Sequence, residues 1–390
     1  MATPSIAMIP SAYKAGTLYS VLPTDGNGDL DVVRASSATR VNQDGLIELM
    51  ANNVPRLDYS DGSCPSLLLE PQSTNLVTYS EDFSDASWAK NSMAVVSNDI
   101  ISPKGDLTAD KVTGDGYIQN LISLTATNVY TFSFFWKKDT SDVVKILLSS
   151  SGTDEELSIN TNTLALISQV GIDSYDNIYF GDGWYRLSMT WSESNTESTG
   201  VRIIADESDA TSSLYIWGAQ LEQQSYATSY IPTSGATATR LADGASKTGI
   251  SSLINSSEGV LYGDVNIIDG DDSTRRLSVS DGTNNNSVYL EITNTYKSYL
   301  VRSGGVSQFS LLENNTELNF KFALKYKLGD FAFWLNGVEV GQTTTGSLPL
   351  NLSRIGFDRG DGGVSFYGNC KDLRVYNLAL TDDELATLTS

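Results

Sequence analysis

Apolar and polar residues alternate with a period of two along much of this 390-residue chain, and this alternation limits it to an all-β fold. In residues 128–137, NVYTFSFFWK, every second residue from Tyr130 to Trp136 is aromatic, so four rings share one face of a predicted strand. Similar segments that predict strands are residues 183–191, 201–204, 214–221 and 318–326. Short strands separated by Ser, Asp, Thr and Gly clusters are typical of antiparallel β-sandwiches, including jelly rolls.

Two local signals near the C-terminus predict specific structures. Asn336-Gly337 lies between the apolar segments 331–335 and 338–340, which predicts a type I′ hairpin because both central positions need a positive φ. Residues 381–388 near the C-terminus read TDDELATL, where Thr381 and Glu384 have the spacing of a capping box. We therefore expect one short C-terminal helix.

Composition divides the chain into domains. Six of the nine prolines fall within residues 1–75, which predicts an irregular N-terminal module. The strand patterns then predict a jelly roll over residues 76–235 and a second sandwich over 250–390. Residues 236–249 between them are small and polar, so we expect a linker there.

Several classes of chemistry are excluded by composition. The chain has no histidine, which removes imidazole bases, Ser/His/Asp triads and histidine-based zinc sites. Its 25 basic and 47 acidic residues give a net charge of −22, which disfavours nucleic-acid partners. Cys64 and Cys370 lie far apart in sequence, and we expect two buried free thiols. No signal peptide or membrane-spanning segment is visible, so no membrane insertion is expected.

Longer strings resemble a group of bacteriophage virion proteins, mostly tail-fibre or appendage proteins. They include YKAGTLYSVLPTDGNGDLDVVRASSATRVNQDGLIE, NVPRLDY and CPSLLLEPQSTNLVTYSEDFSDASWAK in the N-terminal part, and GWYRLSMTW and LYIWGAQLEQQSYATSYIPTSGATATR in the middle. The middle strings are similar to a carbohydrate-binding-module-like jelly roll. The last part, with WLNGVEVG and CKDLRVYNLALTDDELATL, is similar to concanavalin A-like or laminin-G-like sandwiches.

The resemblance implies a virion location, with synthesis in the bacterial cytoplasm and release by lysis. It implies other virion proteins as partners, a homo-oligomer with a trimer favoured, and an N-terminal module that serves virion attachment or oligomerisation. It also implies attachment to a host-surface glycan. It carries no catalytic residue onto this sequence, and a fold alone does not fix a function.

Strand phase suggests where a glycan could bind. Side chains out of phase with the predicted core of the C-terminal sandwich point outward, and aromatic rings with planar polar groups are what sugars require. The candidates for one glycan-binding platform are Tyr289, Trp334, Tyr367, Arg374 and Tyr376. The alternative, which we favour, is that this face packs on another protomer or on a neighbouring domain.

One acidic loop has the spacing of a calcium site. Asp25, Asn27, Asp29 and Asp31 place oxygens at alternate positions, but Leu30 and Ser36 stand where an EF-hand has glycine and glutamate. We therefore expect a turn, with structural calcium as the lesser alternative, and no other cofactor. A second acidic loop, residues 269–272, also favours a loop tip over an ion site.

The sequence shows no glycosidase signature, because no ExDxE strand occurs and the adjacent acidic pairs Glu155-Glu156 and Asp206-Glu207 point to opposite faces of a strand. We therefore expect no enzyme, but a virion protein that attaches to hosts by multivalent, non-catalytic carbohydrate binding. Neutral sugars fit the −22 charge better than anionic polymers. The alternatives are a capsid-decoration or head-fibre protein that binds only its own virion, and a polysaccharide depolymerase.

Overall fold

The computed structural model describes residues 2–149, 154–268 and 273–390. The acidic loop at 269–272 lies outside the described residues. Within these ranges the chain forms antiparallel sheets and one helix, α1 (Asp382–Thr389), so the predicted all-β class and the C-terminal helix are confirmed. Thr381 and Glu384 form the predicted capping box. None of the described helices is long and apolar enough to cross a membrane.

The chain folds into two compact units. Unit 1 comprises residues 1–37, 50–71 and 241–390, and unit 2 comprises residues 38–49 and 72–240. The chain therefore passes from one unit to the other four times. This division differs from the predicted succession of an N-terminal module, a jelly roll, a linker and a sandwich.

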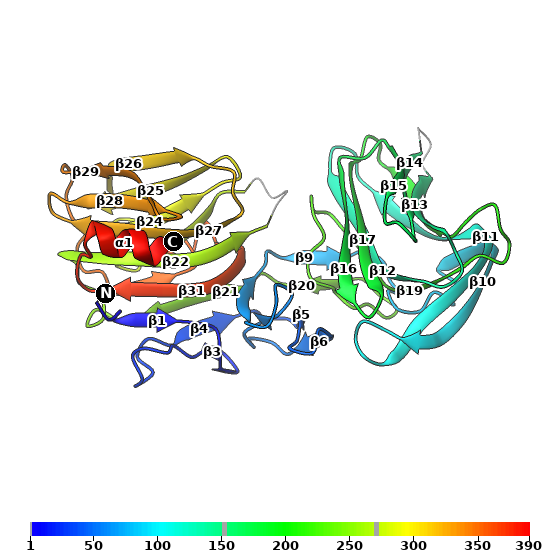
Figure 1. Ribbon diagram of the computed structural model, residues 1–390, viewed down its shortest axis with the longest axis horizontal. Coiled ribbons are helices and arrows are strands. Elements are labelled where there is room, and N and C mark those ends of the chain that lie inside the picture. The colour runs from blue at the N-terminus through cyan, green and yellow to red at the C-terminus, as the bar shows by residue number, and fades with distance from the viewer. Residues whose placement is uncertain (1, 150–153, 269–272) are drawn as a thin grey trace. The chain divides into compact units, whose positions relative to one another are not determined.

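Unit 1 contains two sheets (Figure 1). The eight-stranded sheet of the described residues contains β29 (Val338–Thr343), β28 (Phe331–Leu335), β27 (Asn319–Lys327), β22 (Glu258–Ile267), β31 (Gly368–Tyr376), β8 (Ser66–Leu69) and β7 (Leu57–Asp58), with β1 (Ile6–Met8) beside β31. The nine-stranded sheet contains β2 (Tyr13–Lys14), β3 (Thr17–Leu18), β4 (Leu30–Val33), β21 (Gly244–Thr248), β30 (Arg354–Gly356), β23 (Arg275–Ser280), β24 (Ser287–Ile292), β25 (Tyr296–Ser303) and β26 (Val306–Asn314).

The core of unit 1 follows from strand alternation. The even-numbered residues of β27 from Phe320 to Tyr326 and the odd-numbered residues of β28 from Phe331 to Leu335 are buried in one cluster with residues of both sheets. Asn336 and Gly337 both have positive φ angles, +48° and +82°, between the paired Leu335 and Val338. The predicted strands and the type I′ hairpin are confirmed.

The N-terminal residues form no separate module because their strands complete the sheets of unit 1. β1 and β8 pair with β31, and β4 pairs with β21. The predicted linker contains β21 and also β20 (Ala238–Arg240), which pairs with β9 (Ser73–Asn75). Strands this short have little stability alone, so they are ordered by pairing with long-range partners.

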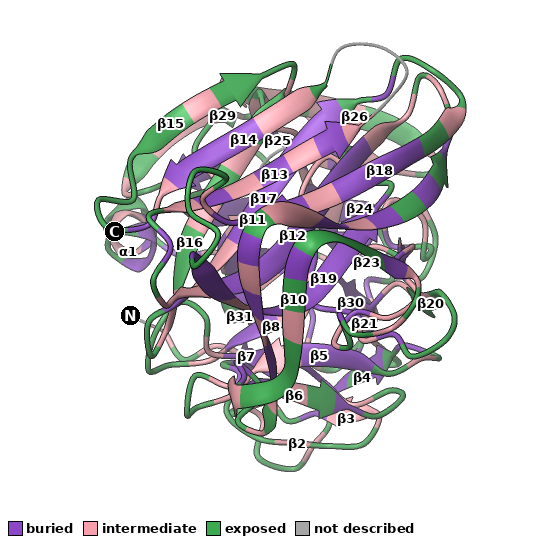
Figure 2. Ribbon diagram, turned by 90° about the vertical axis from the view of Figure 1, so that its right-hand side faces the viewer, coloured by how far each residue is buried: buried purple, intermediate pink, exposed green. Residues whose placement is uncertain are grey.

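Unit 2 contains most of the residues for which a jelly roll was predicted. Its ten-stranded sheet, counted over the described residues, contains β15 (Leu166–Val170), β14 (Glu155–Asn160), β13 (Val143–Ser149), β18 (Glu197–Ile204), β11 (Leu107–Leu124), β19 (Ser213–Glu222), β12 (Val129–Lys138), β17 (Trp184–Ser192) and β16 (Ser174–Gly181), with β10 (Trp88–Ile101) beside β11. A separate hairpin of β5 (Ala38–Val41) and β6 (Ile47–Met50) also belongs to this part of the chain. Figure 2 shows buried residues along β12 and β19 and exposed residues along β10 and β15.

Both faces of the central strands of unit 2 are buried. The four alternating aromatic residues of β12, from Tyr130 to Trp136, face the main core, as predicted. Phe135 faces the other way and packs in a second cluster with Trp184, Trp217 and Tyr230. The outer face of β12, β17 and β19 is therefore covered and not open to solvent.

Four buried charges join the three chain segments of unit 1. The Arg34 Nη1 atom lies 3.0 Å from Asp243 Oδ1, Arg56 Nη1 lies 2.5 Å from Glu70 Oε2, and Arg56 also pairs with Asp243. Burial tends to lower the pKa of Arg56, but Asp243 and Glu70 raise it above its usual range. All four side chains are buried, so each charge depends on its partners for compensation.

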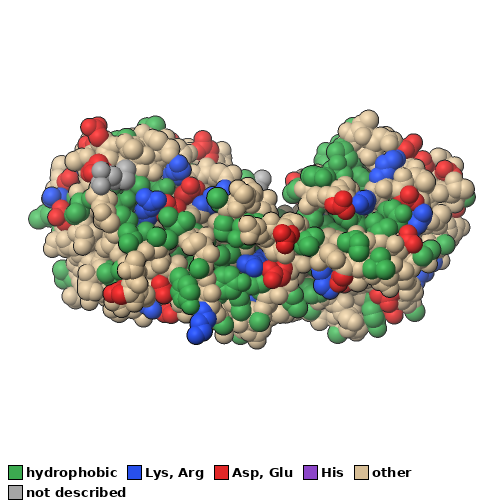
Figure 3. All heavy atoms as spheres, turned by 60° about the horizontal axis from the view of Figure 1, so that its bottom comes forward, with side chains coloured by type: hydrophobic (Ala, Val, Ile, Leu, Met, Phe, Trp, Pro, Cys, Tyr) green, Lys and Arg blue, Asp and Glu red, His purple; other side chains and the backbone are tan. Residues whose placement is uncertain are grey.

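The surface carries mixed charges. On the face shown in Figure 3, Lys and Arg side chains lie among acidic, polar and apolar ones. Cys370 is buried, but Cys64 is exposed, so the expectation of two buried thiols was wrong for Cys64. Cys64 lies in a turn between β7 and β8, which leaves its side chain outside the sheet.

We predict that Asp243→Asn lowers the free energy of unfolding by about 3–5 kcal/mol, because it leaves two buried arginines without their shared counter-charge. Equilibrium urea denaturation measures the change. Glu258→Gln is the control, since Glu258 pairs with the half-exposed Lys327 at 2.9 Å and should cost at most about 1 kcal/mol. Equal effects of the two variants would contradict the importance of the buried network.

Candidate functional site

The five residues predicted to bind a glycan do not form one platform. Tyr289 lies on β24 in the nine-stranded sheet, whereas Trp334 on β28 and Arg374 and Tyr376 on β31 belong to the eight-stranded sheet. Tyr367 lies outside the strands. Strand alternation gave the direction of these side chains, but it did not say which sheet each strand joins.

Helix α1 covers the outward face of the sheet around Trp334. Trp334 and Tyr376 are buried in a cluster with Leu385 and Leu388 of α1. The side chains point away from the main core, as predicted, but the cover comes from the same chain and not from a protomer or a second domain. A capping box predicts where a helix begins, not the surface on which it packs.

Two other candidates, Tyr289 and Arg374, already interact with charged side chains beside them. The Arg276 guanidinium lies 4.8 Å from the ring centre of Tyr289, which is 2% exposed. Arg374 donates to Asp372, with Nε to Oδ1 at 3.0 Å and Nη2 to Oδ2 at 2.5 Å. Half-buried Tyr367 is the one aromatic candidate that retains a partly accessible side chain.

The acidic loop at residues 25–31 behaves as a turn. Asp25 accepts from the Asn27 amide, Asp29 accepts from Ser20, and Asp31 lies 3.7 Å from Lys247. The carboxylates thus have separate protein partners. Among the described residues no group of three or more His, Cys, Asp or Glu side chains could hold a metal ion.

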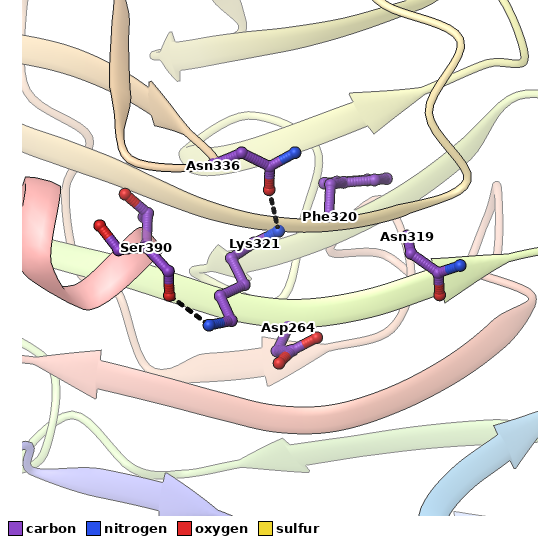
Figure 4. A pocket seen from close by; sticks show the side chains of 7 residues that line it. Asp264, Asn319, Phe320, Lys321, Asn336 and Ser390 are labelled. Atoms are coloured by element: carbon purple, nitrogen blue, oxygen red, sulfur yellow. Dashed lines mark hydrogen bonds between the residues drawn. The ribbon is translucent and has the colours of Figure 1, made fainter. Parts of the chain in front are cut away.

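A hollow of about 310 Å³ lies beside the last turn of α1 (Figure 4). Lys321 crosses it and donates to the Ser390 carbonyl, and the Lys321 backbone amide donates to Asn336 Oδ1 at 2.8 Å. Asp264 lies on the neighbouring β22, and burial raises the pKa of its carboxyl. Phe320 is buried in the core, so this hollow offers polar groups without an open aromatic ring.

The more complete site lies in unit 2, on the outer face of β12, β17 and β19. There, Phe135, Trp184, Trp217 and Tyr230 pack together with Ile47 of the β5–β6 hairpin. Phe180 meets the edge of Phe135, with 5.0 Å between the ring centres. We call these six residues the aromatic cluster.

A pocket of about 140 Å³, which we call the turn pocket, lies at one side of the aromatic cluster. Its lining combines two aromatic rings with carboxylates, a hydroxyl and loop backbone: Asp44, Gly45, Leu46, Ile101, Ser102, Pro103, Phe180, Gly181, Asp182 and Trp184. The φ angles of Asp182 and Gly183, +49° and +76°, are those of a type I′ turn joining β16 to β17. This turn places Trp184 at the wall of the pocket.

Trp184 supplies a free donor. Its Nε1 is buried and has no hydrogen-bond partner among the residues that the structure describes. By contrast, Trp217 Nε1 donates to Thr108 Oγ1 at 3.1 Å. Buried donors are nearly always satisfied in proteins, so the unpartnered Trp184 indole is unusual, and its side chain also lines the turn pocket.

A second pocket, of about 150 Å³, is lined by residues of the β5–β6 hairpin, and we call it the hairpin pocket. It is lined by Thr39, Ile47, Leu49, Glu81, Lys104, Tyr230 and Pro232. Tyr230 donates to Glu81 Oε1 at 3.0 Å, and burial raises the pKa of Glu81. The Ile47 amide donates to the Pro103 carbonyl at 3.0 Å, so one backbone contact separates the two pockets.

Sequence reasoning missed this site, although a signal was present. Phe135 is out of phase with the core face of its strand, and Asp182-Gly183 is a hairpin signal before Trp184. The phase rule that selected Trp334 would also have selected Phe135. The arrival of residues 38–49 over this face depends on long-range chain crossing, which no local pattern predicts.

We predict that Trp334→Ala lowers the free energy of unfolding by about 3 kcal/mol, because it leaves a cavity between the sheet and α1. Val338→Ala on the same hairpin is the control, since Val338 is 64% exposed. Chemical denaturation measures both. A stable Trp334→Ala variant that loses glycan binding would instead restore the platform interpretation.

Comparisons with known proteins give distant likenesses. No family model matches the chain. No curated protein matches it either. Similar solved structures include the CBM40 of Ruminococcus gnavus IT-sialidase, at 18% identity and TM-score 0.30, covering 35% of this chain and 84% of that one. Domains LG4-5 of the mouse laminin alpha1 chain give 10% identity and TM-score 0.24, with 69% and 88% covered. Trypanosoma rangeli sialidase has 12% sequence identity and a TM-score of 0.28, and the match covers 92% of this chain and 77% of the sialidase. Likenesses at this level do not decide what the chain binds.

Proposed function

We propose that this chain is a non-catalytic carbohydrate-binding protein and that the turn pocket receives a sugar ring. The observation that carries the proposal is that Phe180 and Trp184 line the turn pocket together with the carboxylates of Asp44 and Asp182, and that the buried Trp184 Nε1–H has no partner among the described residues. Sugars need an apolar surface for their C–H faces and planar polar groups for their hydroxyls. The turn pocket supplies both within one small space.

We extend the proposal to a bacteriophage virion, where the protein attaches the particle to a host surface. The resemblance of the N-terminal and middle strings to virion proteins supports this role. The net charge of −22 and the carboxylates of the pocket favour a neutral glycan, because an anionic polymer would be repelled. Other virion proteins are the partners in this proposal.

Multivalency makes a small pocket useful. A pocket of about 140 Å³ holds one ring at most, so each contact is weak and several copies on one particle are needed. The terminal strands of the unit 2 sheet, β15 and β16, expose Ile167, Val170, Ile178 and Tyr179. Exposed apolar side chains on strands at a sheet edge favour association, which supports the proposed homo-oligomer.

The absence of catalysis is part of the proposal. A glycosidase acid works when shielding from water keeps it protonated, whereas Asp44 and Asp182 are exposed. Asp182 is also held by Lys137, with 3.2 Å between the carboxylate oxygen and Nζ. These two carboxylates are therefore placed to accept hydrogen bonds from hydroxyl groups.

We predict that Trp184→Phe weakens glycan binding about three- to tenfold, because it keeps a ring in the pocket but removes one hydrogen-bond donor. Binding of the purified full chain to an array of neutral bacterial surface polysaccharides measures the affinity. Trp136→Phe is the matched control, since the Trp136 indole donates to Asn177 Oδ1 at 3.0 Å and its side chain lines neither pocket.

Three outcomes separate the proposal from its rivals. Binding that weakens with Trp184→Phe but not with Trp136→Phe, while the polymer keeps its length, supports the proposed function. Shortened polysaccharide chains would favour a depolymerase. A folded protein that binds no glycan but binds its own virion would favour capsid decoration.

A further inference from the structure

We infer that the hairpin pocket is a subsite for the N-acetyl group of an amino sugar, next to the ring held in the turn pocket. This inference rests on the proposed function and names the class of glycan. The two pockets lie on either side of the contact between the Ile47 amide and the Pro103 carbonyl. A disaccharide or a substituted ring can therefore engage both.

The walls of the hairpin pocket fit a methyl group. Ile47 and Leu49 of β6, Pro232 and the Tyr230 ring form an apolar surface around about 150 Å³. Burying a methyl group there removes apolar area from water, which contributes favourably to binding. A sugar hydroxyl in the same position would lose hydrogen bonds to water without gaining a partner from these walls.

Polar groups at the pocket match the amide of an acetamido group. Glu81 accepts from Tyr230 through Oε1, and a carboxylate has capacity for further donors, so it can accept the ligand N–H. Lys104 pairs with Asp106 at 3.0 Å and retains N–H groups that can donate to the ligand carbonyl.

These features discriminate between substituents. A deoxysugar methyl group has no N–H for Glu81, and an O-acetyl ester has none either. A carboxylate-bearing sugar would bring a negative charge beside Glu81, which is unfavourable in a partly buried place. The acetamido group is the substituent that uses the apolar walls, the acceptor and the donor together.

Contacts with the rest of unit 2 hold the β5–β6 hairpin in place. Gly105, with φ +89°, allows the turn at 102–106 to approach Leu46, since a Cβ there would lie 2.9 Å from Leu46 Cδ1. Thr39 donates to the Tyr230 carbonyl at 2.5 Å and ties the other strand of the hairpin to the pocket wall. The hairpin residues that line both pockets are therefore held in position by the fold.

The test compares neutral oligosaccharides that differ at one kind of substituent: N,N′,N″-triacetylchitotriose against cellotriose, and N-acetylgalactosamine against galactose displayed on the same array. The full chain should bind at least one N-acetylated member about tenfold or more tightly than its hydroxyl counterpart. Leu49→Asn should reduce that preference to within about threefold, because it places a polar amide in the apolar wall. Leu49 is 57% exposed, so folding should be preserved.

Leu121→Asn is the matched control, since Leu121 is 62% exposed in the same unit and lines neither pocket. Glu81→Gln should weaken the N-acetylated member about threefold or more and leave the hydroxyl member unchanged. Equal binding of both members of every pair would overturn the N-acetyl subsite and leave the proposed function standing. No binding of any glycan, here and on the polysaccharide array, would overturn both.

Discussion

The fold of this chain depends on a buried network of four charges, Arg34, Arg56, Glu70 and Asp243. These residues come from the three chain segments of unit 1, and each lies near a point where the chain passes to unit 2. Such pairs add little net stability over apolar packing, but losing one partner is costly because a buried charge remains. The network therefore fixes the path of the chain more than it fixes its stability.

That path explains how the proposed site arises in unit 2. Residues 38–49 are attached at both ends to segments of unit 1 and return as the β5–β6 hairpin, which covers the aromatic cluster. Ile47 packs on Trp184, Trp217 and their neighbours and lines the hairpin pocket, while Asp44, Gly45 and Leu46 line the turn pocket. Without this hairpin the outer face of β12, β17 and β19 would be an exposed aromatic surface and not a site with defined walls.

Local patterns predicted the local structure well. The alternation in β12 and β27, the Asn336-Gly337 turn and the Thr381 cap all depend on neighbours in sequence, and the structure confirms them. The domain limits and the glycan platform depended on which distant strands pair and on where α1 packs. The alternation correctly predicted that Trp334 points away from the main core, but it did not predict what surrounds the side chain. The eight-residue helix α1 covers this outward face of the sheet, and strand alternation carries no information about where a helix packs.

The most direct test is a proton–nitrogen NMR spectrum of the six tryptophan indoles, with the Trp184 signal assigned by its loss in Trp184→Phe. The probe is the array glycan that binds most tightly, added to saturation. The account predicts a large shift of the Trp184 indole signal, because the sugar ring comes to lie beside an indole whose N–H has no protein partner, and no comparable shift for Trp136, whose indole donates to Asn177 and lines neither pocket. An unmoved Trp184 signal in the saturated protein would contradict a sugar ring in the turn pocket.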